Sequence, residues 1–217
     1  MEIPDIVKDR NGFDSFNPMQ EKALNAGVLE KSLVVSAPTA SGKTVVAELG
    51  ALQSILVNGK KVVYTCPLRA LASEHSNDFK KKYSKEFNIK TVLSTGDFDS
   101  SGKYLSSKDI IFTTYEKLNS LLNHNSEWLA SIGLLVIDEI HSLGNNRGTT
   151  LEMLITKLRF LNPQLKLLGL SATIPNAKEL SNWLKADLVE SDYRPVELKE
   201  GVFFDGMSFW NNKNGIA

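Results

Sequence analysis

The chain has 217 residues, of which 42% are hydrophobic and 23% charged, a globular composition. Its 25 basic and 25 acidic residues leave no formal net charge, which excludes a protein that holds nucleic acid through bulk positive charge. The single cysteine, Cys66, excludes internal disulfides and is expected to be a buried apolar side chain. No apolar run approaches the ~20 residues of a membrane span, and the acidic start lacks the features of a signal peptide. We therefore expect a cytoplasmic protein without a membrane partner.

Short apolar segments alternate with stretches of helical periodicity along the chain. The segments predicted to be strands are 32–36, 62–66, 89–94, 109–113, 133–138, 165–170 and a last one near Leu188. The run at 133–138 is almost continuously apolar, as in strands that are buried on both faces of a parallel sheet. This alternation predicts a doubly wound α/β domain with a mainly parallel, seven-stranded sheet.

The two ends of the chain depart from this rhythm. Near the start, Asn17 is a good N-cap, Pro18 suits the first helical position, and Gln20 completes a capping box. After about residue 195 the alternation of predicted strands and helices no longer continues. Within the chain, residues 99–107 are rich in Ser and Gly and are predicted to be a loop. We therefore divide the chain into an N-terminal segment (1–30), an α/β domain (31–195) and an exit segment (196–217).

A phosphate-binding loop is predicted between the first strand and its helix. Residues 37–44 read Ala-Pro-Thr-Ala-Ser-Gly-Lys-Thr, which matches G-x-x-x-x-G-K-[ST] except that Ala37 replaces the first glycine. Backbone N–H groups at the helix start would surround a phosphate, Lys43 would reach the β- and γ-phosphates, and the Thr44 hydroxyl would ligate Mg²⁺. The residues expected to contact the nucleotide here are Thr39, Ala40, Ser41, Gly42, Lys43 and Thr44. The alternative is an ordinary strand-turn-helix that contains Gly-Lys-Thr.

A pair of carboxylates follows the most apolar predicted strand. In parallel sheets ligands bind at the carboxyl ends of the strands, so Asp138 and Ser171 are expected on the same edge as Lys43. Asp138 would hold Mg²⁺, and Glu139 would orient or deprotonate the attacking water. The alternative is a solvated turn that happens to carry two acidic residues.

Several short segments occur together in a familiar order. They are Ala-Pro-Thr-Ala-Ser-Gly-Lys-Thr, Pro-Leu-Arg-Ala-Leu, Thr-Gly-Asp, Thr-Thr-Tyr-Glu-Lys, Asp-Glu-Ile-His and Ser-Ala-Thr. In kind and order they resemble the motifs of superfamily 2 helicases, in particular the Ski-like branch, and they are most similar to the archaeal Hjm-type DNA helicases that work on branched DNA and stalled forks. The resemblance covers about residues 16 to 202. It implies the first RecA-like motor domain of such an enzyme, with ATP and Mg²⁺ as cofactors.

The resemblance also implies roles for residues outside the phosphate loop. Gln20, with the preceding aromatic Phe16, would read adenine, although the capping box alone would also explain Gln20. The residues that would hold a sugar-phosphate backbone are Arg69, Thr95, Gly96 and Thr114. The residues that would couple the nucleotide state to domain closure are His141, Ser171 and Thr173. Taken alone, Arg69 would be an ordinary surface residue and His141 a structural histidine.

A working helicase of this kind has a second RecA-like domain with a Gln-x-x-Gly-Arg-x-Gly-Arg motif, and no such sequence occurs here. We therefore expect a truncated, monomeric first domain that binds Mg·ATP weakly, hydrolyses it very slowly and unwinds nothing. Its expected partners are single-stranded or forked DNA, with RNA left open, and the second RecA-like domain of the same protein.

The alternatives are a domain of a Ski-like RNA helicase or an ATP-gated nucleic-acid clamp. Glu139 argues against the clamp, because a pure binder needs no group to activate water. A small-molecule P-loop kinase would leave Ser-Ala-Thr unexplained.

Overall fold

In the computed structural model, the residues described are 2–96, 102–123, 127–144, 148–196, 201–204 and 207–210. Seven strands form one sheet in the order β3-β4-β2-β5-β6-β1-β7, and every neighbouring pair is parallel. Their bounds are β1 Leu33–Ser36, β2 Lys61–Cys66, β3 Thr91–Ser94, β4 Ile110–Thr114, β5 Ile132–Ile137, β6 Lys166–Ser171 and β7 Asp187–Glu190. The predicted seven-stranded parallel sheet is therefore confirmed.

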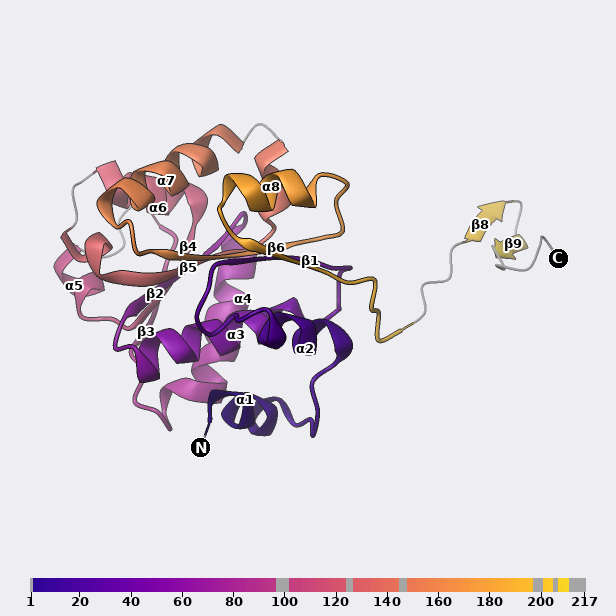
Figure 1. The fold of residues 1–217 in the computed structure, drawn as a ribbon, viewed down its shortest axis with the longest axis horizontal. Coiled ribbons are helices and arrows are strands. Elements are labelled where there is room, and N and C mark those ends of the chain that lie inside the picture. Colours follow the sequence, from indigo (N-terminus) through magenta and orange to yellow (C-terminus); the bar gives the residue numbers. More distant parts are fainter. Residues whose placement is uncertain are drawn as a thin grey trace.

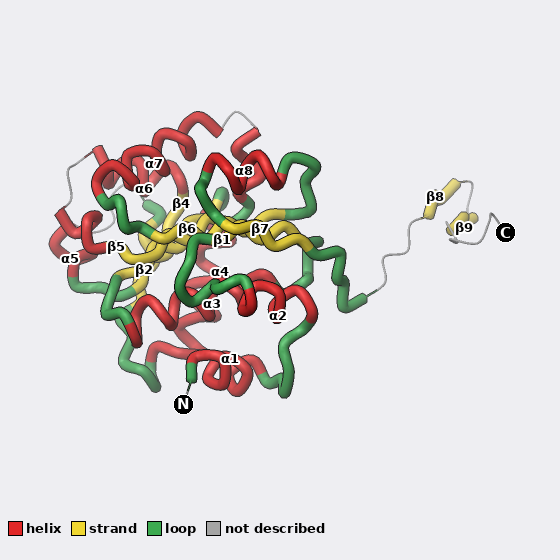
Figure 2. Tube along the Cα trace, viewed as in Figure 1, coloured by secondary structure: helices red, strands yellow, loops and turns green. Residues whose placement is uncertain are grey.

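Helices cover both faces of this sheet (Figure 1). One face carries α2 (Pro18–Asn25), α3 (Lys43–Leu52) and α4 (Arg69–Phe79), with α1 (Ile3–Asn11) packed outside α3. The other face carries α6 (Tyr115–Asn123), α7 (Gly148–Leu161) and α8 (Ala177–Trp183). Each face has its own buried apolar cluster, because strands that are apolar throughout present hydrophobic side chains to both sides. Figure 2 shows the resulting three layers, with the strands in yellow between the red helices.

The remaining helical turns are short. They are the π-helical turns η1 (Gln53–Val57) and η2 (Lys80–Ser84), the helix α5 (Gly102–Ser106), and the 3₁₀ turns η3 (Glu127–Ser131) and η4 (Ile140–Gly144). In the described part of the chain, no helix has the length and apolar character that a membrane crossing needs.

The capping box at the start of α2 is confirmed. The side-chain oxygen of Asn17 accepts hydrogen bonds from the backbone N–H groups of Met19 and Gln20, each at 3.0 Å. The Gln20 side-chain oxygen in turn accepts from the Asn17 N–H at 3.0 Å. Both arms satisfy donors that the first turn of a helix otherwise leaves unpaired.

One expectation from the sequence needs correction. The segment 99–107 is not all loop, because its described part contains α5. Beyond residue 195, where the sequence no longer alternates between strands and helices, β8 (Gly201–Phe204) and β9 (Met207–Trp210) pair as a separate antiparallel sheet. Cys66, by contrast, is the buried free cysteine that was predicted.

Candidate nucleotide and nucleic-acid sites

The sheet order separates the predicted site residues into two groups along one edge. Every strand is parallel, so the carboxyl ends of all seven lie on the same edge. The residues predicted to touch nucleic acid follow or end β2, β3 and β4, which are neighbours in one half of the sheet. The phosphate loop, the Asp138–Glu139 pair and Ser171 follow or end β1, β5 and β6 in the other half, while the predicted adenine-reading residues Phe16 and Gln20 lie at or just before α2. The topology thus brings motifs that are scattered in the sequence together into two adjoining groups of predicted site residues.

The loop between β1 and α3 has the backbone of a phosphate-binding turn. Ala40 and Gly42 both have positive φ angles, 62° and 87°, which turn the chain sharply before α3 begins at Lys43. The Ala37 N–H donates to the Ser171 carbonyl at 3.1 Å, which ties the start of the loop to the end of β6. The helix that starts here directs its free N–H groups and its positive dipole end into the loop.

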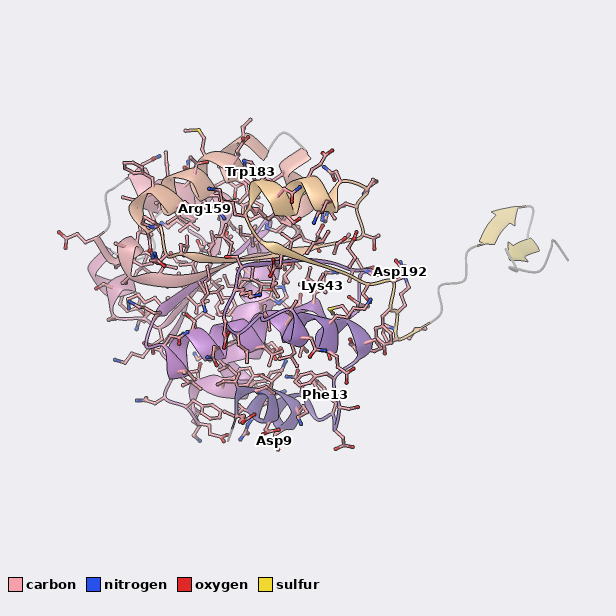
Figure 3. The ribbon with its side chains drawn as sticks, viewed as in Figure 1. Asp9, Phe13, Lys43, Arg159, Trp183 and Asp192 are labelled. Atoms are coloured by element: carbon pink, nitrogen blue, oxygen red, sulfur yellow. The ribbon has the colours of Figure 1, made fainter. Side chains whose placement is uncertain are left out.

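The Lys43 side chain folds back over its own loop. Its Nζ donates to the carbonyl oxygens of Ala37 at 2.8 Å and Pro38 at 2.9 Å. Burial lowers the pKa of the amine, and the nearby carboxylates of Glu139 and Asp138 oppose that shift. Figure 3 shows Lys43 between the sheet and the helices α2 and α3. The cation is thus held at the loop by groups that a phosphate could replace.

Asp138 and Glu139 occupy the turn immediately after β5. Asp138 is only 8% exposed, and its N–H donates to the Thr65 carbonyl at 2.9 Å. One of its oxygens, Oδ1, accepts from the Glu139 N–H at 3.0 Å. Glu139 itself has a φ of 53°, a conformation that is uncommon for a residue with a side chain. His141 Nδ1 lies 3.3 Å from Glu139 Oε2, without hydrogen-bond geometry.

The residues around this loop fit a polar ligand such as Mg·ATP. The hydroxyls of Ser41 and Ser171 are buried, and neither has a hydrogen-bond partner within the described residues. Buried polar groups are rarely left unpaired unless a ligand or water completes them. With Lys43, the Thr44 hydroxyl and two carboxylates alongside, the donor set suits a phosphate chain and a hard, oxygen-preferring cation.

The predicted adenine-reading residues lie beside the phosphate loop. Gln20 is 4% exposed, and its side-chain amide donates to the Gly42 carbonyl at 3.3 Å. Phe16 is partly buried and packs edge-on against Phe13, with ring centroids 5.5 Å apart. Thr173, predicted to couple nucleotide state to closure, is exposed just beyond β6. Contact between Gln20 and adenine remains a prediction.

On the other half of the edge, a hollow of about 300 Å³ brings together three of the residues predicted to hold a nucleic-acid backbone. Arg69, Thr95 and Thr114 line it, and Gly96 follows Thr95 in the chain. Arg69 is exposed at the start of α4, and the Thr114 hydroxyl accepts from the Lys117 N–H at 3.3 Å at the start of α6. Helix starts, hydroxyls and one guanidinium are groups that bind phosphates.

The structure adds residues that the sequence did not single out. Lys117 and Ser120 also line the hollow. The Tyr115 hydroxyl donates to the Asp138 carbonyl, and His75 Nε2 lies 3.0 Å from Asp138 Oδ2. A signal for His75 was present, because it lies three residues after Ala72 and four before Phe79, both buried on the same side of α4.

A parallel sheet with this loop and these carboxylates at one edge defines a RecA-like α/β domain. The model of the DEAD/DEAH box helicase family matches residues 17–180, and the chain belongs to that family. It is similar to the ATP-dependent DNA helicase Hel308 of Caldivirga maquilingensis, with 48% identity over 97% of this chain and 28% of the relative. Hel308 of Pyrococcus abyssi is 45% identical over 97% of the chain and 29% of the relative.

A solved helicase structure is also similar to this chain. The crystal structure of the DUF1998 helicase MrfA bound to DNA matches with a TM-score of 0.71 and 28% identity, over 86% of this chain and 29% of that one. The resemblance to the Ski-like branch of superfamily 2 helicases is therefore confirmed. The chain spans less than a third of the length of these curated relatives.

Proposed function

We propose that this chain is the first motor domain of an ATP-dependent DNA helicase that moves 3′ to 5′ on branched or forked DNA. The observation that carries the proposal is the division of the sheet edge. The phosphate loop and the Asp138–Glu139 turn lie in one half, and the hollow lined by Arg69, Thr95 and Thr114 lies in the other. Strand β2, which leads to Arg69, pairs directly with β5, which leads to Asp138, so the two sites share a boundary.

In the nucleotide half, each side chain has a role that its position supports. Mg·ATP, when bound, supplies the phosphoryl group and the metal charge that make transfer to water feasible. Lys43 would exchange its carbonyl partners for phosphate oxygens, and Thr44 and Asp138 would hold the metal. Glu139 would orient the attacking water and accept its proton. Gln20 would contact adenine from its place beside Gly42.

In the nucleic-acid half, the groups suit a sugar-phosphate backbone and not base edges. Arg69 and Lys117 supply charge, and the hydroxyls of Thr95 and Thr114 accept or donate hydrogen bonds. Contacts of this kind fix the position of a strand without reading its sequence. The chain as a whole has no net charge, so we expect weak, salt-sensitive binding through a few such contacts.

Ser171, Thr173 and His141 would report the nucleotide state to a second RecA-like domain that completes the ATP site. Without that domain we expect weak Mg·ATP binding, very slow hydrolysis and no unwinding, because arginines supplied by a partner domain contribute orders of magnitude to the rate. We expect the domain to be monomeric and cytoplasmic.

Oligonucleotide binding tests the nucleic-acid half. Labelled 20-nucleotide oligo(dT) and oligo(rU) are titrated with the chain at the same low salt, with and without a non-hydrolysable Mg·ATP analogue. We expect measurable binding with a preference for DNA. A preference for RNA would favour the Ski-like RNA helicase instead, and binding of neither would refute the role of the hollow.

The Glu139→Gln variant, made in a protein with both motor domains, separates an enzyme from an ATP-gated clamp. Loss of hydrolysis with retained Mg·ATP binding supports the enzyme, whereas unchanged nucleic-acid cycling supports the clamp. The matched control is Glu152→Gln, since Glu152 is exposed on α7.

A further inference from the structure

One thiol, one imidazole and one carboxylate gather at the boundary between the two sites. Among the described residues, Cys66, His75 and Asp138 form a group whose potential ligand atoms all lie within 4.8 Å of one another. They come from three elements, because Cys66 ends β2, His75 lies on α4 and Asp138 follows β5. The cysteine is buried, and the side chains of His75 and Asp138 are only 17% and 11% exposed. Three separate elements thus bring ligand groups to one largely enclosed point.

We propose that Cys66, His75 and Asp138 form a binding site for a transition-metal ion, with Zn²⁺ as the best fit. Zinc accepts thiolate, imidazole and carboxylate ligands at about 2.0–2.3 Å, which places ligand atoms about 3.5 Å apart around a tetrahedral ion. The distance from His75 Nε2 to Asp138 Oδ2 is 3.0 Å, and no pair in the group exceeds 4.8 Å. Side-chain shifts of about an ångström would complete the geometry, with water at the fourth position.

The surroundings already orient two of the ligands. Asp138 Oδ1 is occupied by the Glu139 N–H, which leaves Oδ2 directed at His75. The His75 ring lies against the ring of Tyr64, with centroids 5.0 Å apart. Outer contacts of this kind hold ligands ready and contribute to metal affinity.

The charges balance for a divalent ion. On binding, the Cys66 thiol would lose its proton to solvent. The His75 imidazole would stay neutral: any hydrogen on Nε2 would leave to solvent while Nδ1 takes one up, so that Nε2 faces the metal where it now faces Asp138. Thiolate and carboxylate together then supply two negative charges. A hard ion such as Mg²⁺ prefers oxygen ligands, so the thiol and imidazole select a softer ion.

The site has a functional consequence that rests on the proposed function. Asp138 cannot serve Zn²⁺ and the nucleotide-bound Mg²⁺ at the same time. Zinc would therefore compete with Mg·ATP, and the chain would be inhibited by this metal at the catalytic edge itself.

Calorimetric titration of the chain with ZnCl₂, without nucleotide, tests the site. We expect one ion per chain, and an affinity weakened roughly tenfold or more by Cys66→Ser, Cys66→Ala or His75→Gln. The control is His141→Gln, which removes another imidazole at the same edge and should leave zinc binding unchanged. Zinc binding that survives in the cysteine variants but is lost in His141→Gln would overturn the proposal.

Cobalt provides a spectroscopic test that needs no variant. Co²⁺ bound to a thiolate gives an intense near-ultraviolet charge-transfer band, and its absence at saturating Co²⁺ would show that Cys66 is not a ligand.

The competition between zinc and Mg·ATP is tested by loading the chain with zinc, removing free metal and titrating Mg·ATP. We expect the zinc-loaded chain to bind Mg·ATP roughly tenfold more weakly, or weaker still, than the metal-free chain. The Cys66→Ser variant, treated with zinc in the same way, should keep its affinity for Mg·ATP. Equal affinity in both forms of the wild type would refute the competition. Failure of the metal-free chain to bind Mg·ATP would count against the proposed function and leave the zinc result standing.

Discussion

A buried carboxylate, Glu48, joins the phosphate-loop helix to two other elements, and its removal should be costly. Glu48 is 4% exposed on α3. It accepts hydrogen bonds from Lys82 at 2.8 Å, the Tyr83 hydroxyl at 2.7 Å and the Asn11 amide at 2.7 Å. Burial opposes the charged form of Lys82, but hydrogen bonds to Asp78 and Glu48 outweigh it and raise the lysine pKa. Because that pKa is raised, this stabilisation is fully present at neutral pH and is lost only as pH rises above 10.5.

The loss of stability expected for Glu48→Ala depends on the partners that Lys82 and Tyr83 keep. Removing one partner of a buried ion pair typically costs ~3–5 kcal/mol, and leaving a buried hydroxyl unpaired costs ~1–3 kcal/mol. Lys82 keeps Asp78 as a partner at 2.6 Å, so we expect the lower end, ~3 kcal/mol of unfolding free energy. For a domain of this size that is a drop in Tm of ~6–12 °C.

Urea denaturation followed by circular dichroism measures the loss. Glu48→Gln, which keeps an acceptor but not the charge, should lie between wild type and Glu48→Ala. Glu152→Ala, at an exposed helical position, should change stability by less than ~0.5 kcal/mol. A loss for Glu48→Ala as small as that of the control would refute the view that this carboxylate holds the three elements together.

Two further variants test the edge of the sheet. Arg69→Ala should weaken oligo(dT) binding and reduce the slope of log affinity against log salt by ~0.7, because one phosphate contact is lost. Lys81→Ala, beyond the far end of α4, should leave that slope unchanged. Equal effects of the two substitutions would show that Arg69 does not bind the nucleic acid in the hollow. Tyr115→Phe removes the hydroxyl that donates to the Asp138 carbonyl and should lower the free energy of unfolding by ~1–3 kcal/mol, measured by urea denaturation. Tyr104→Phe, at a site 48% exposed, should leave that free energy unchanged. An unchanged stability for Tyr115→Phe would show that this hydrogen bond contributes nothing.

The sheet could be predicted because its signal is local. Strands buried on both faces are continuously apolar, as in β5, and turn residues separate them from the helices. Parallel strands then place all the loops that follow them on one edge, so the gathering of Lys43, Asp138 and Ser171 needed no further information. The capping box of Asn17 and Gln20 was equally local, since both partners lie within one turn.

What escaped prediction depends on contacts between distant elements. The approach of His75 to Asp138 depends on how α4 packs on the sheet, because only that packing brings the His75 side chain to the turn after β5. The fold of Lys43 onto its own loop depends on carbonyls that become available only once the turn has formed. The hairpin of β8 and β9 lies outside the main rhythm, where short strands give little periodicity to detect.

Calorimetry of Mg·ATP binding tests the phosphate loop on this chain and on its Lys43→Ala variant, with Lys85→Ala, at an exposed lysine, as the matched control. We predict weak binding by the wild type and by Lys85→Ala, and an affinity lowered at least ~10-fold in Lys43→Ala, since the amine would lose its contacts with the β- and γ-phosphates. Binding that survives unchanged in Lys43→Ala would place the phosphate site elsewhere and refute the proposed role of this loop.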